Sequence, residues 1–306
     1  MEPFPKYELQ LLPFSFGEEE LLMTMHSARP NGDGWTPAQR LAGKVAVVIG
    51  AGQSPGQGLG NGRATTIRFA REGALVLAVD RRLESAQETA EIIKSEGFTC
   101  EAFAADVTRE ADLEATMQAA RQRWGSLDVL YNNVGVSLEG GDADLQEITE
   151  EAFDNIYRIN LRGTAFACKQ AVKIMRQQRS GVIVNMASAA AIQNNPTVAY
   201  RTTKAAVITL TQQLAIQNAP YGIRANCLMP GLIDTPMAVE KRADRAGLSR
   251  EQVLAQRDSK VPLRGKQGTA WDVANAALFL SSDEANFITG IGMLIDGGRV
   301  LDAGRF

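Results

Sequence analysis

The chain has 306 residues with a formal net charge of −3, and 45% of them are hydrophobic. This size fits one large α/β domain or at most two domains, and the composition indicates neither nucleic-acid binding nor a membrane-spanning stretch. The single histidine, His26, lies outside the regularly patterned region, which excludes a Ser-His-Asp hydrolase or a histidine-ligated metal site in the core.

Three cysteines, Cys100, Cys168 and Cys227, lie far apart in the chain. Their spacing fits neither a metal site nor the disulfide framework of a secreted protein. We therefore expect buried free thiols, no bound metal and a location in the reducing cytoplasm.

Residues 1–40 show no alternation of strands and helices and are rich in proline, glycine and glutamate. They lack the basic start and the unbroken apolar stretch of a secretory signal. We interpret them as a partly ordered N-terminal arm that packs on a neighbouring subunit. Met23 and Met25 leave open a start of translation within this arm.

Residues 41–306 are predicted to form a single domain, because apolar runs and amphipathic stretches alternate regularly from there on. The runs expected to form strands are 45–49, 74–79, 99–105, 127–131, 181–187, 223–229 and 291–295. The stretches expected to form helices are 63–72, 84–96, 109–124, 151–179 and 199–218. This order predicts a doubly wound, Rossmann-type sheet of seven mostly parallel strands with helices on both faces, and ligands bind where the strands end.

The first strand runs into a glycine-rich loop, VAVVIGAGQSPGQGLGNG, over residues 45–62. A strand that turns through glycines into a helix exposes backbone N–H groups at the positive end of the helix dipole, and such groups bind phosphate. Glycines alone are also typical of a plain flexible loop, so this motif needs support from elsewhere.

Asp80 ends the second apolar run, about 20 residues past the last glycine of the loop, a spacing that suits a hydrogen bond to an adenosine ribose. A carboxylate at this point repels a 2′-phosphate, which favours NAD over NADP. Arg81 and Arg82 act against this preference, because a guanidinium can pair with the extra phosphate. The alternative role of Asp80 is to cap the next helix.

Two polar residues stand out further along the chain. Asn160 interrupts the amphipathic stretch 151–179, where an amide is unfavourable, so we expect it either to order water or to lie exposed. Ser188 follows the strand 181–187, where its hydroxyl can stabilise charge on a reacting oxygen or cap a turn.

Tyr200 and Lys204 are four residues apart, which places them one turn apart on one face of a helix. A phenol has a pKa near ~10, and a nearby ammonium favours its ionised form. Lys204 is therefore expected to lower the pKa of Tyr200, so that the phenol can exchange a proton with a substrate oxygen. Alone, this spacing also arises by chance.

Together these motifs make residues 41–300 resemble the short-chain dehydrogenase/reductase family, in its single-domain branch. The family's Tyr-x-x-x-Lys motif matches Tyr200 and Lys204, and Ser188 and Asn160 complete its catalytic tetrad. The resemblance implies hydride transfer between a nicotinamide coenzyme and a secondary alcohol or ketone.

The resemblance also implies coenzyme contacts where other family motifs match. These motifs are the glycine loop, an Asp-Val pair, Asn-Asn-Ala-Gly in the form NNVG, and Pro-Gly with the residues that follow. The residues implied to bind the coenzyme are Gly50, Gly60, Gly62, Asp80, Asp106, Val107, Asn133, Gly135, Tyr200, Lys204, Pro230, Gly231, Ile233 and Thr235.

The chain departs from the family pattern in three places. Ile49 stands where the family has threonine, and Ser188 lies one residue closer to Tyr200 than expected. The glycine loop is also longer, by about six residues. We interpret the segment GQSPGQ as an insertion that can fold over the pyrophosphate or ribose of the coenzyme.

We therefore expect an NAD(H)-dependent oxidoreductase for a small polar alcohol or ketone. Residues 236–262 are expected to form the substrate lid, and Gln193, Asn194 and Asn195 suit a polar pocket or a solvated turn. The alternatives are an NADP-dependent 3-oxoacyl thioester reductase and a dinucleotide-binding protein without turnover. The resemblance also implies a homotetramer or a homodimer.

Overall fold

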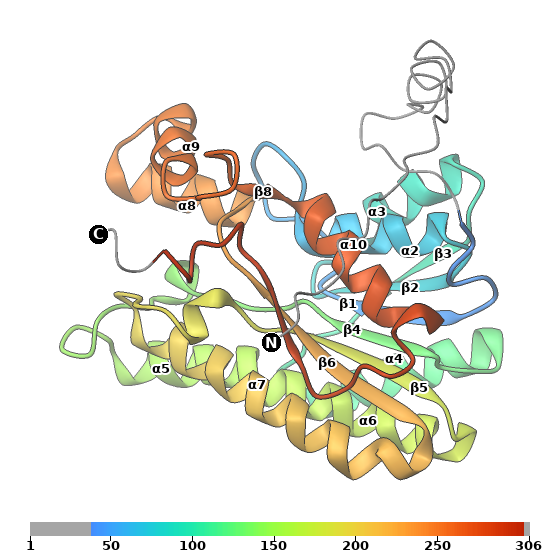
Figure 1. Ribbon diagram of the computed structural model, residues 1–306. Coiled ribbons are helices and arrows are strands. Elements are labelled where there is room, and N and C mark those ends of the chain that lie inside the picture. Colours follow the sequence, from blue (N-terminus) through green and yellow to red (C-terminus); the bar gives the residue numbers. More distant parts are fainter. Residues whose placement is uncertain (1–37, 303–306) are drawn as a thin grey trace, which may run out of the picture. The chain divides into compact units, whose positions relative to one another are not determined.

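A seven-stranded parallel sheet, in the order β3-β2-β1-β4-β5-β6-β9, forms the centre of the domain in the computed structural model (Figure 1). The structure describes residues 38–302. The strands are β1 Val45–Ile49, β2 Leu75–Asp80, β3 Cys100–Ala104, β4 Val129–Asn132, β5 Gly181–Met186, β6 Ile223–Pro230 and β9 Gly292–Ile295. The predicted Rossmann-type sheet is thereby confirmed, whereas most of the predicted N-terminal arm, 1–40, lies outside the described residues.

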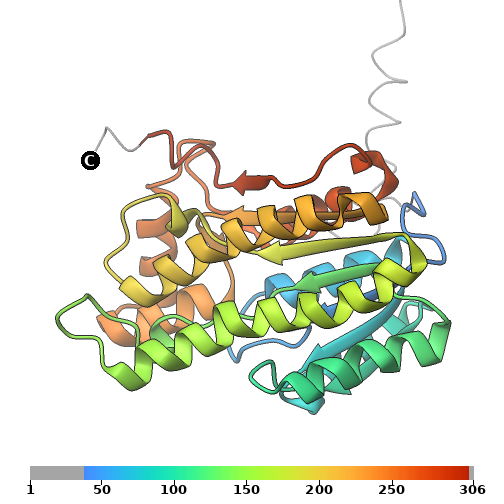
Figure 2. The same cartoon turned by 90° about the horizontal axis from the view of Figure 1, so that it is seen from below.

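Helices cover both faces of this sheet, as its strand pattern predicts. Figure 2 shows α4, α6 and α7 side by side on one face, while α2, α3 and α10 cover the other. The helices are α2 Asn61–Arg71, α3 Leu83–Ser95, α4 Glu110–Trp124, α5 Glu150–Tyr157, α6 Thr164–Gln178, α7 Val198–Asn218, α8 Pro236–Ala246, α9 Arg250–Asp258 and α10 Ala270–Ser281.

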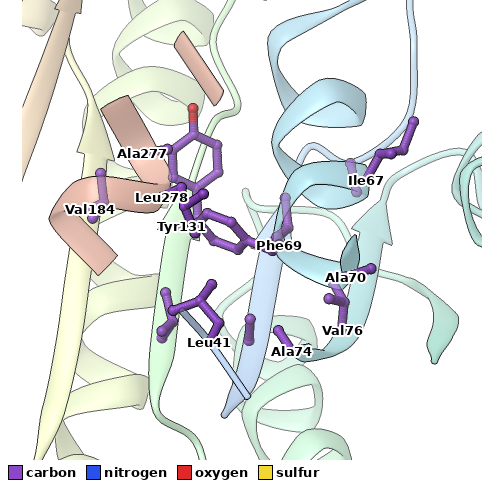
Figure 3. Packing of buried hydrophobic residues seen from close by; sticks show 14 of the residues in the cluster. Leu41, Ile67, Phe69, Ala70, Ala74, Val76, Tyr131, Val184, Ala277 and Leu278 are labelled. Carbon is purple, nitrogen blue, oxygen red and sulfur yellow. The ribbon is translucent and has the colours of Figure 1, made fainter. Parts of the chain in front are cut away.

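Alternate side chains of the strands point to opposite faces of the sheet and pack in two separate hydrophobic cores. Val47 of β1 packs with α4 and α6, whereas Val48 packs with α2 and α10. Figure 3 shows the second core, where the rings of Phe69 and Tyr131 meet edge to face at 6.0 Å between centroids. Because both faces of β1 and β2 are buried, these strands are almost continuous apolar runs, which is why they could be read from the sequence.

The sheet reverses its strand order between β1 and β4, and the carboxyl ends of all strands meet at one edge there. Beyond β6, the chain forms a two-stranded sheet of β7 Ile233–Asp234 and β8 Gly268–Thr269. Between them lies the α8–α9 segment, residues 236–258, beside the edge where the strands end (Figure 1). Within residues 38–302, no helix has both the length and the apolar character needed to cross a bilayer.

Candidate active site

Lys204 projects from α7 towards the end of β5. Its Nζ donates a hydrogen bond of 2.7 Å to the carbonyl oxygen of Met186 and lies 5.6 Å from the centroid of the Tyr200 ring. Only 2% of the lysine is exposed, and this burial lowers its pKa to about 8. The ammonium therefore stays mostly protonated at neutral pH. A Cβ on Gly135 would lie 2.9 Å from Nζ, so the glycine of the NNVG motif makes room for this lysine.

The pKa of Tyr200 lies above its ordinary value, which corrects the expected lowering by Lys204. Burial of the phenol is the largest cause, and it outweighs a hydrogen bond with Ser188 that acts in the opposite direction. Glu139 adds to the upward shift, while Arg242 of α8 acts against it. Spacing along a helix predicted the neighbour, but it carried no information on how deeply the ring is buried.

Ser188 caps a short turn, which is one of the two roles that its position suggested. Its Oγ accepts a 3.1 Å hydrogen bond from the N–H of Ala190, and the side chain lies close enough to Tyr200 to act against the rise in the pKa of the phenol. The residue is 7% exposed. The hydroxyl is thereby fixed next to the phenol, despite the shortened spacing between the two residues.

Asn160 lies in one turn of π-helix, Arg158–Gly163, that separates α5 from α6. The helical stretch predicted over 151–179 is therefore confirmed, with one widened turn inside it, and the alternative of an exposed amide is excluded because Asn160 is 0% exposed. Its Oδ1 accepts from the N–H of Val136 at 2.8 Å, and its Nδ2 donates to Val136 O and to Thr203 Oγ1 at 2.9 and 3.2 Å. The amide thus joins the loop after β4 to Thr203 of α7, the residue before Lys204. Widened turns of this kind are frequent at functional sites.

Asp142 is a residue that the sequence reasoning missed. Its carboxylate is 3% exposed and accepts hydrogen bonds of 3.0 and 2.9 Å from the N–H groups of Ala199 and Tyr200. It caps α7 from a distant loop, and its negative charge faces the positive end of the helix dipole. No local pattern reveals such a cap, because donor and acceptor are 57 and 58 residues apart.

Replacement of Asp142 by alanine should lower the free energy of unfolding by about 1–2 kcal/mol, since two N–H groups lose their acceptor. Turnover should fall as well, because the same turn carries Tyr200. Calorimetry and kcat measure the two effects. The control is Asp144→Ala, an exposed carboxylate of the same loop. Equal melting temperatures for both variants would contradict the capping role.

The loop after β1 is shaped to approach a ligand closely. Gly50 has a φ of +83°, and its carbonyl oxygen accepts a 3.1 Å hydrogen bond from Asn133 Nδ2. A Cβ on Gly62 would lie 1.8 Å from the same carbonyl oxygen. The N-terminus of α2 has no side-chain cap and no acidic residue in its first turn. These features fit a dinucleotide pyrophosphate held by backbone N–H groups.

Asp80 lies at the end of β2, as predicted. Its two oxygens accept hydrogen bonds from the N–H groups of Gly52 and Arg82, at 3.1 and 3.0 Å. The guanidinium of Arg82 turns to the carbonyl oxygen of Gln53 and to Ser85 Oγ. The carboxylate therefore supports the glycine loop and the turn before α3, and each oxygen keeps a further lone pair for a ribose hydroxyl.

The remaining predicted coenzyme contacts also follow strand ends. Asp106 comes after β3 and accepts a 2.8 Å hydrogen bond from Thr108 N, and Val107 packs against Gly163 of the π-helical turn. Gly231 follows Pro230 at the end of β6, where a Cβ would lie 2.6 Å from Asp296 Cβ. Two further residues continue this connection, and they are Ile233 in β7 and Thr235 at the N-cap of α8.

None of the cysteines carries a reactive thiol, although Cys227 lies near Lys204. All three are buried and free, and burial raises the pKa of Cys100 and Cys168 to about 12 and that of Cys227 to about 11. The thiols are therefore protonated and unreactive at neutral pH. In the part of the chain that the structure describes, no three potential metal ligands cluster together.

Comparisons with known proteins agree over the whole domain. Residues 56–299 match a family model described as enoyl-(acyl carrier protein) reductase. A 2-(R)-hydroxypropyl-CoM dehydrogenase of Xanthobacter autotrophicus is 36% identical over 262 residues, which cover 83% of this chain and 97% of the relative. A 3-oxoacyl-[acyl-carrier-protein] reductase of Thermotoga maritima is 36% identical over 263 residues, covering 86% and 100%. The crystal structure of a short-chain dehydrogenase/reductase from Burkholderia xenovorans has a TM-score of 0.77 and 38% identity, covering 85% and 97%.

Proposed function

Because the chain belongs to the short-chain dehydrogenase/reductase family, we propose that it is an NAD(H)-dependent oxidoreductase acting on a small polar secondary alcohol or ketone. The observation that carries this proposal is the buried ammonium of Lys204, which lies 5.6 Å from the centroid of the Tyr200 ring, with the side chain of Ser188 close enough to act on the phenol. The same edge of the sheet carries the glycine loop that fits a dinucleotide.

Each member of the tetrad has a role in the proposed reaction. When bound, the nicotinamide accepts hydride from the alcohol or supplies it to the ketone. Tyr200 Oη takes the substrate's hydroxyl proton in oxidation and returns it in reduction, and Ser188 Oγ orients the substrate oxygen. The ammonium of Lys204 favours the phenolate over the phenol, although burial keeps the pKa of Tyr200 above its ordinary value, and Asn160 holds the loop after β4 in place.

The coenzyme preference is proposed to be NAD. Asp80 repels the 2′-phosphate of NADP, and the guanidinium of Arg82 is already engaged by the glycine loop. The similarity to a 3-oxoacyl reductase keeps open the alternative of an NADP-dependent thioester reductase. A higher kcat/KM for NADP+ than for NAD+ in the unaltered protein would decide for that alternative.

Replacement of Asp80 by asparagine should reduce the preference for NAD+ over NADP+ by about tenfold, because the side chain keeps its size but loses its charge. The ratio of kcat/KM for the two coenzymes measures this change. Glu84→Gln, a neighbouring acidic residue at the start of α3, serves as the control. An unchanged ratio in Asp80→Asn would remove Asp80 from the ribose site.

The substrate is proposed to be polar, and the α8–α9 segment is proposed to be its lid. Arg242 of this segment acts electrostatically on Tyr200, and Gln193 accepts a 3.1 Å hydrogen bond from Arg299. The test is an oxidation screen with NAD+ over sugars, polyols, hydroxy acids and cyclic alcohols. Dinucleotide binding without turnover of any of them would favour the non-catalytic alternative.

The assembly is proposed to be a homodimer or homotetramer. Phe153 and Tyr157 of α5 and Ile216 of α7 are exposed by 39%, 47% and 70%, which is unusual for large apolar side chains on neighbouring helices. Light scattering on the purified protein distinguishes the two assemblies from a monomer.

A further inference from the structure

The insertion that lengthens the glycine loop is closed by its own side chain. We call residues 51–59 the insertion loop. Gln53 Nε2 donates to the carbonyl oxygen of Gly58 at 3.0 Å, and Gln53 Oε1 accepts from the N–H of Gly60 at 3.0 Å. One amide thus bridges the two arms of the loop, which gives the loop a fixed shape.

The near end of the insertion loop is fastened to the turn between β2 and α3. The N–H of Gln53 donates to Ser85 Oγ at 2.8 Å, and its carbonyl oxygen accepts from the guanidinium of Arg82. Asp80, the proposed ribose ligand, binds the N–H of Gly52 at the same place. The loop therefore starts at the adenosine side of the proposed coenzyme site.

The far end of the loop is fastened to the α8–α9 segment. The N–H of Gln57 donates to Glu240 Oε1 at 3.2 Å, and Arg250 donates to the same oxygen at 2.8 Å. Arg250 also pairs with Asp234 at 2.6 Å. Arg250 is 14% exposed, while Glu240 is 28% exposed. This cluster joins the insertion loop to both helices of the proposed lid.

Gly56 makes this junction possible. Its φ is +127°, and a Cβ there would lie 2.4 Å from Glu240 Cγ. A side chain at this position would be strained by the positive φ and would push the side chain of Glu240 away from the loop. The approach of the loop to the α8–α9 segment can be followed in Figure 1, where the connection between β1 and α2 extends towards β8.

We propose that Glu240 and Arg250 are positioning residues of the coenzyme site, which make the insertion loop a strap between the adenosine side of the cleft and the lid. The strap ends next to Gly60, the N-cap of α2, where the pyrophosphate is proposed to bind. Since the strap and the lid are joined at Glu240, the dinucleotide leaves when this contact opens. This inference rests on the proposed function, because the strap acts on a bound nicotinamide dinucleotide.

The main test is the rate of NADH release from the full-length protein, followed by stopped-flow fluorescence during displacement by excess NAD+. Glu240→Ala should raise the dissociation rate constant about tenfold, with little change in the association rate constant. Glu240→Gln retains an acceptor for Gln57 but loses the ion pair with Arg250. Its dissociation rate constant should therefore lie between those of the unaltered protein and Glu240→Ala. Lys241→Ala, an exposed neighbour on α8, is the matched control.

A double variant that combines Gly56→Ala with Glu240→Ala tests whether the two residues act through the same contact or loosen the structure independently. Gly56→Ala alone should speed release as Glu240→Ala does, and the double variant should release NADH no faster than either single variant. Hydrogen exchange of residues 53–60 gives a second measurement that does not depend on NADH. The amides of this segment should exchange faster in Glu240→Ala than in Lys241→Ala.

The possible failures are distinguishable. Tight NADH binding with equal release rates in Glu240→Ala and Lys241→Ala would overturn the strap but leave the proposed function intact. Equal hydrogen exchange in these two variants would likewise overturn it. Absence of NADH binding by the unaltered, folded protein would overturn the proposed function, and with it the strap.

Discussion

Replacement of Tyr200 by phenylalanine should reduce kcat by about a thousandfold or more, while the dissociation constant of NADH stays within about twofold. The substitution removes the hydroxyl that lies near Ser188 and is proposed to exchange a proton with the substrate. The ring remains, so α7 and the position of Lys204 should not change. Fluorescence titration measures NADH binding, and absorbance of the reduced nicotinamide measures turnover.

The matched control is Tyr221→Phe, which removes a phenolic hydroxyl from a short helical turn after α7, where the ring stacks on Arg176. This variant should keep full turnover. If Tyr200→Phe also turned over at a near-normal rate, Tyr200 could not be the acid-base group. Loss of NADH binding together with turnover would instead point to a structural role for the hydroxyl.

The fold could be predicted from the sequence where local pattern and burial coincide. β1 is buried along its whole length, and its five apolar residues mark its ends correctly. The predicted strand 127–131 differs from β4, Val129–Asn132, because the buried Asn132 continues the strand and bonds to Asn185 in β5. A polar residue at the end of a strand falls outside the apolar run by which the strand was recognised.

The parts of the candidate site that escaped prediction depend on contacts between distant residues. Asp142 reaches the start of α7 from another loop, and Gln57 meets Glu240 across 183 residues. Periodicity reports only which residues share a face of one element, so neither contact leaves a local signal. The direction of the Tyr200 pKa shift escaped for the same reason, because burial is a property of the folded chain.

The glycine loop, by contrast, was predicted from its composition, and the structure explains why two of its glycines differ in importance. A Cβ on Gly62 would lie 1.8 Å from the carbonyl oxygen of Gly50 and 2.7 Å from Asn133 Nδ2. At Gly60, the N-cap of the same helix, the nearest atom to a Cβ is Gln53 Oε1 at 3.9 Å. Of these two glycines, Gly62 is therefore the one that is sterically constrained.

Replacement of Gly62 by alanine should weaken NADH binding by at least about a hundredfold, because the start of α2 must move away from the end of β1. The clash is with main chain rather than with a flexible side chain, so it should also cost about 2–3 kcal/mol of folding free energy. NADH titration and calorimetry, at a temperature where the variant is folded, separate the two effects.

The control is Gly60→Ala, which should cost about 1 kcal/mol or less and leave NADH binding within about threefold, since its methyl group enters open space. If both variants bound NADH equally well, the dinucleotide would not rest on the N-terminus of α2, and the cradle formed by Gly50 and Gly62 would serve only to pack this helix against the sheet.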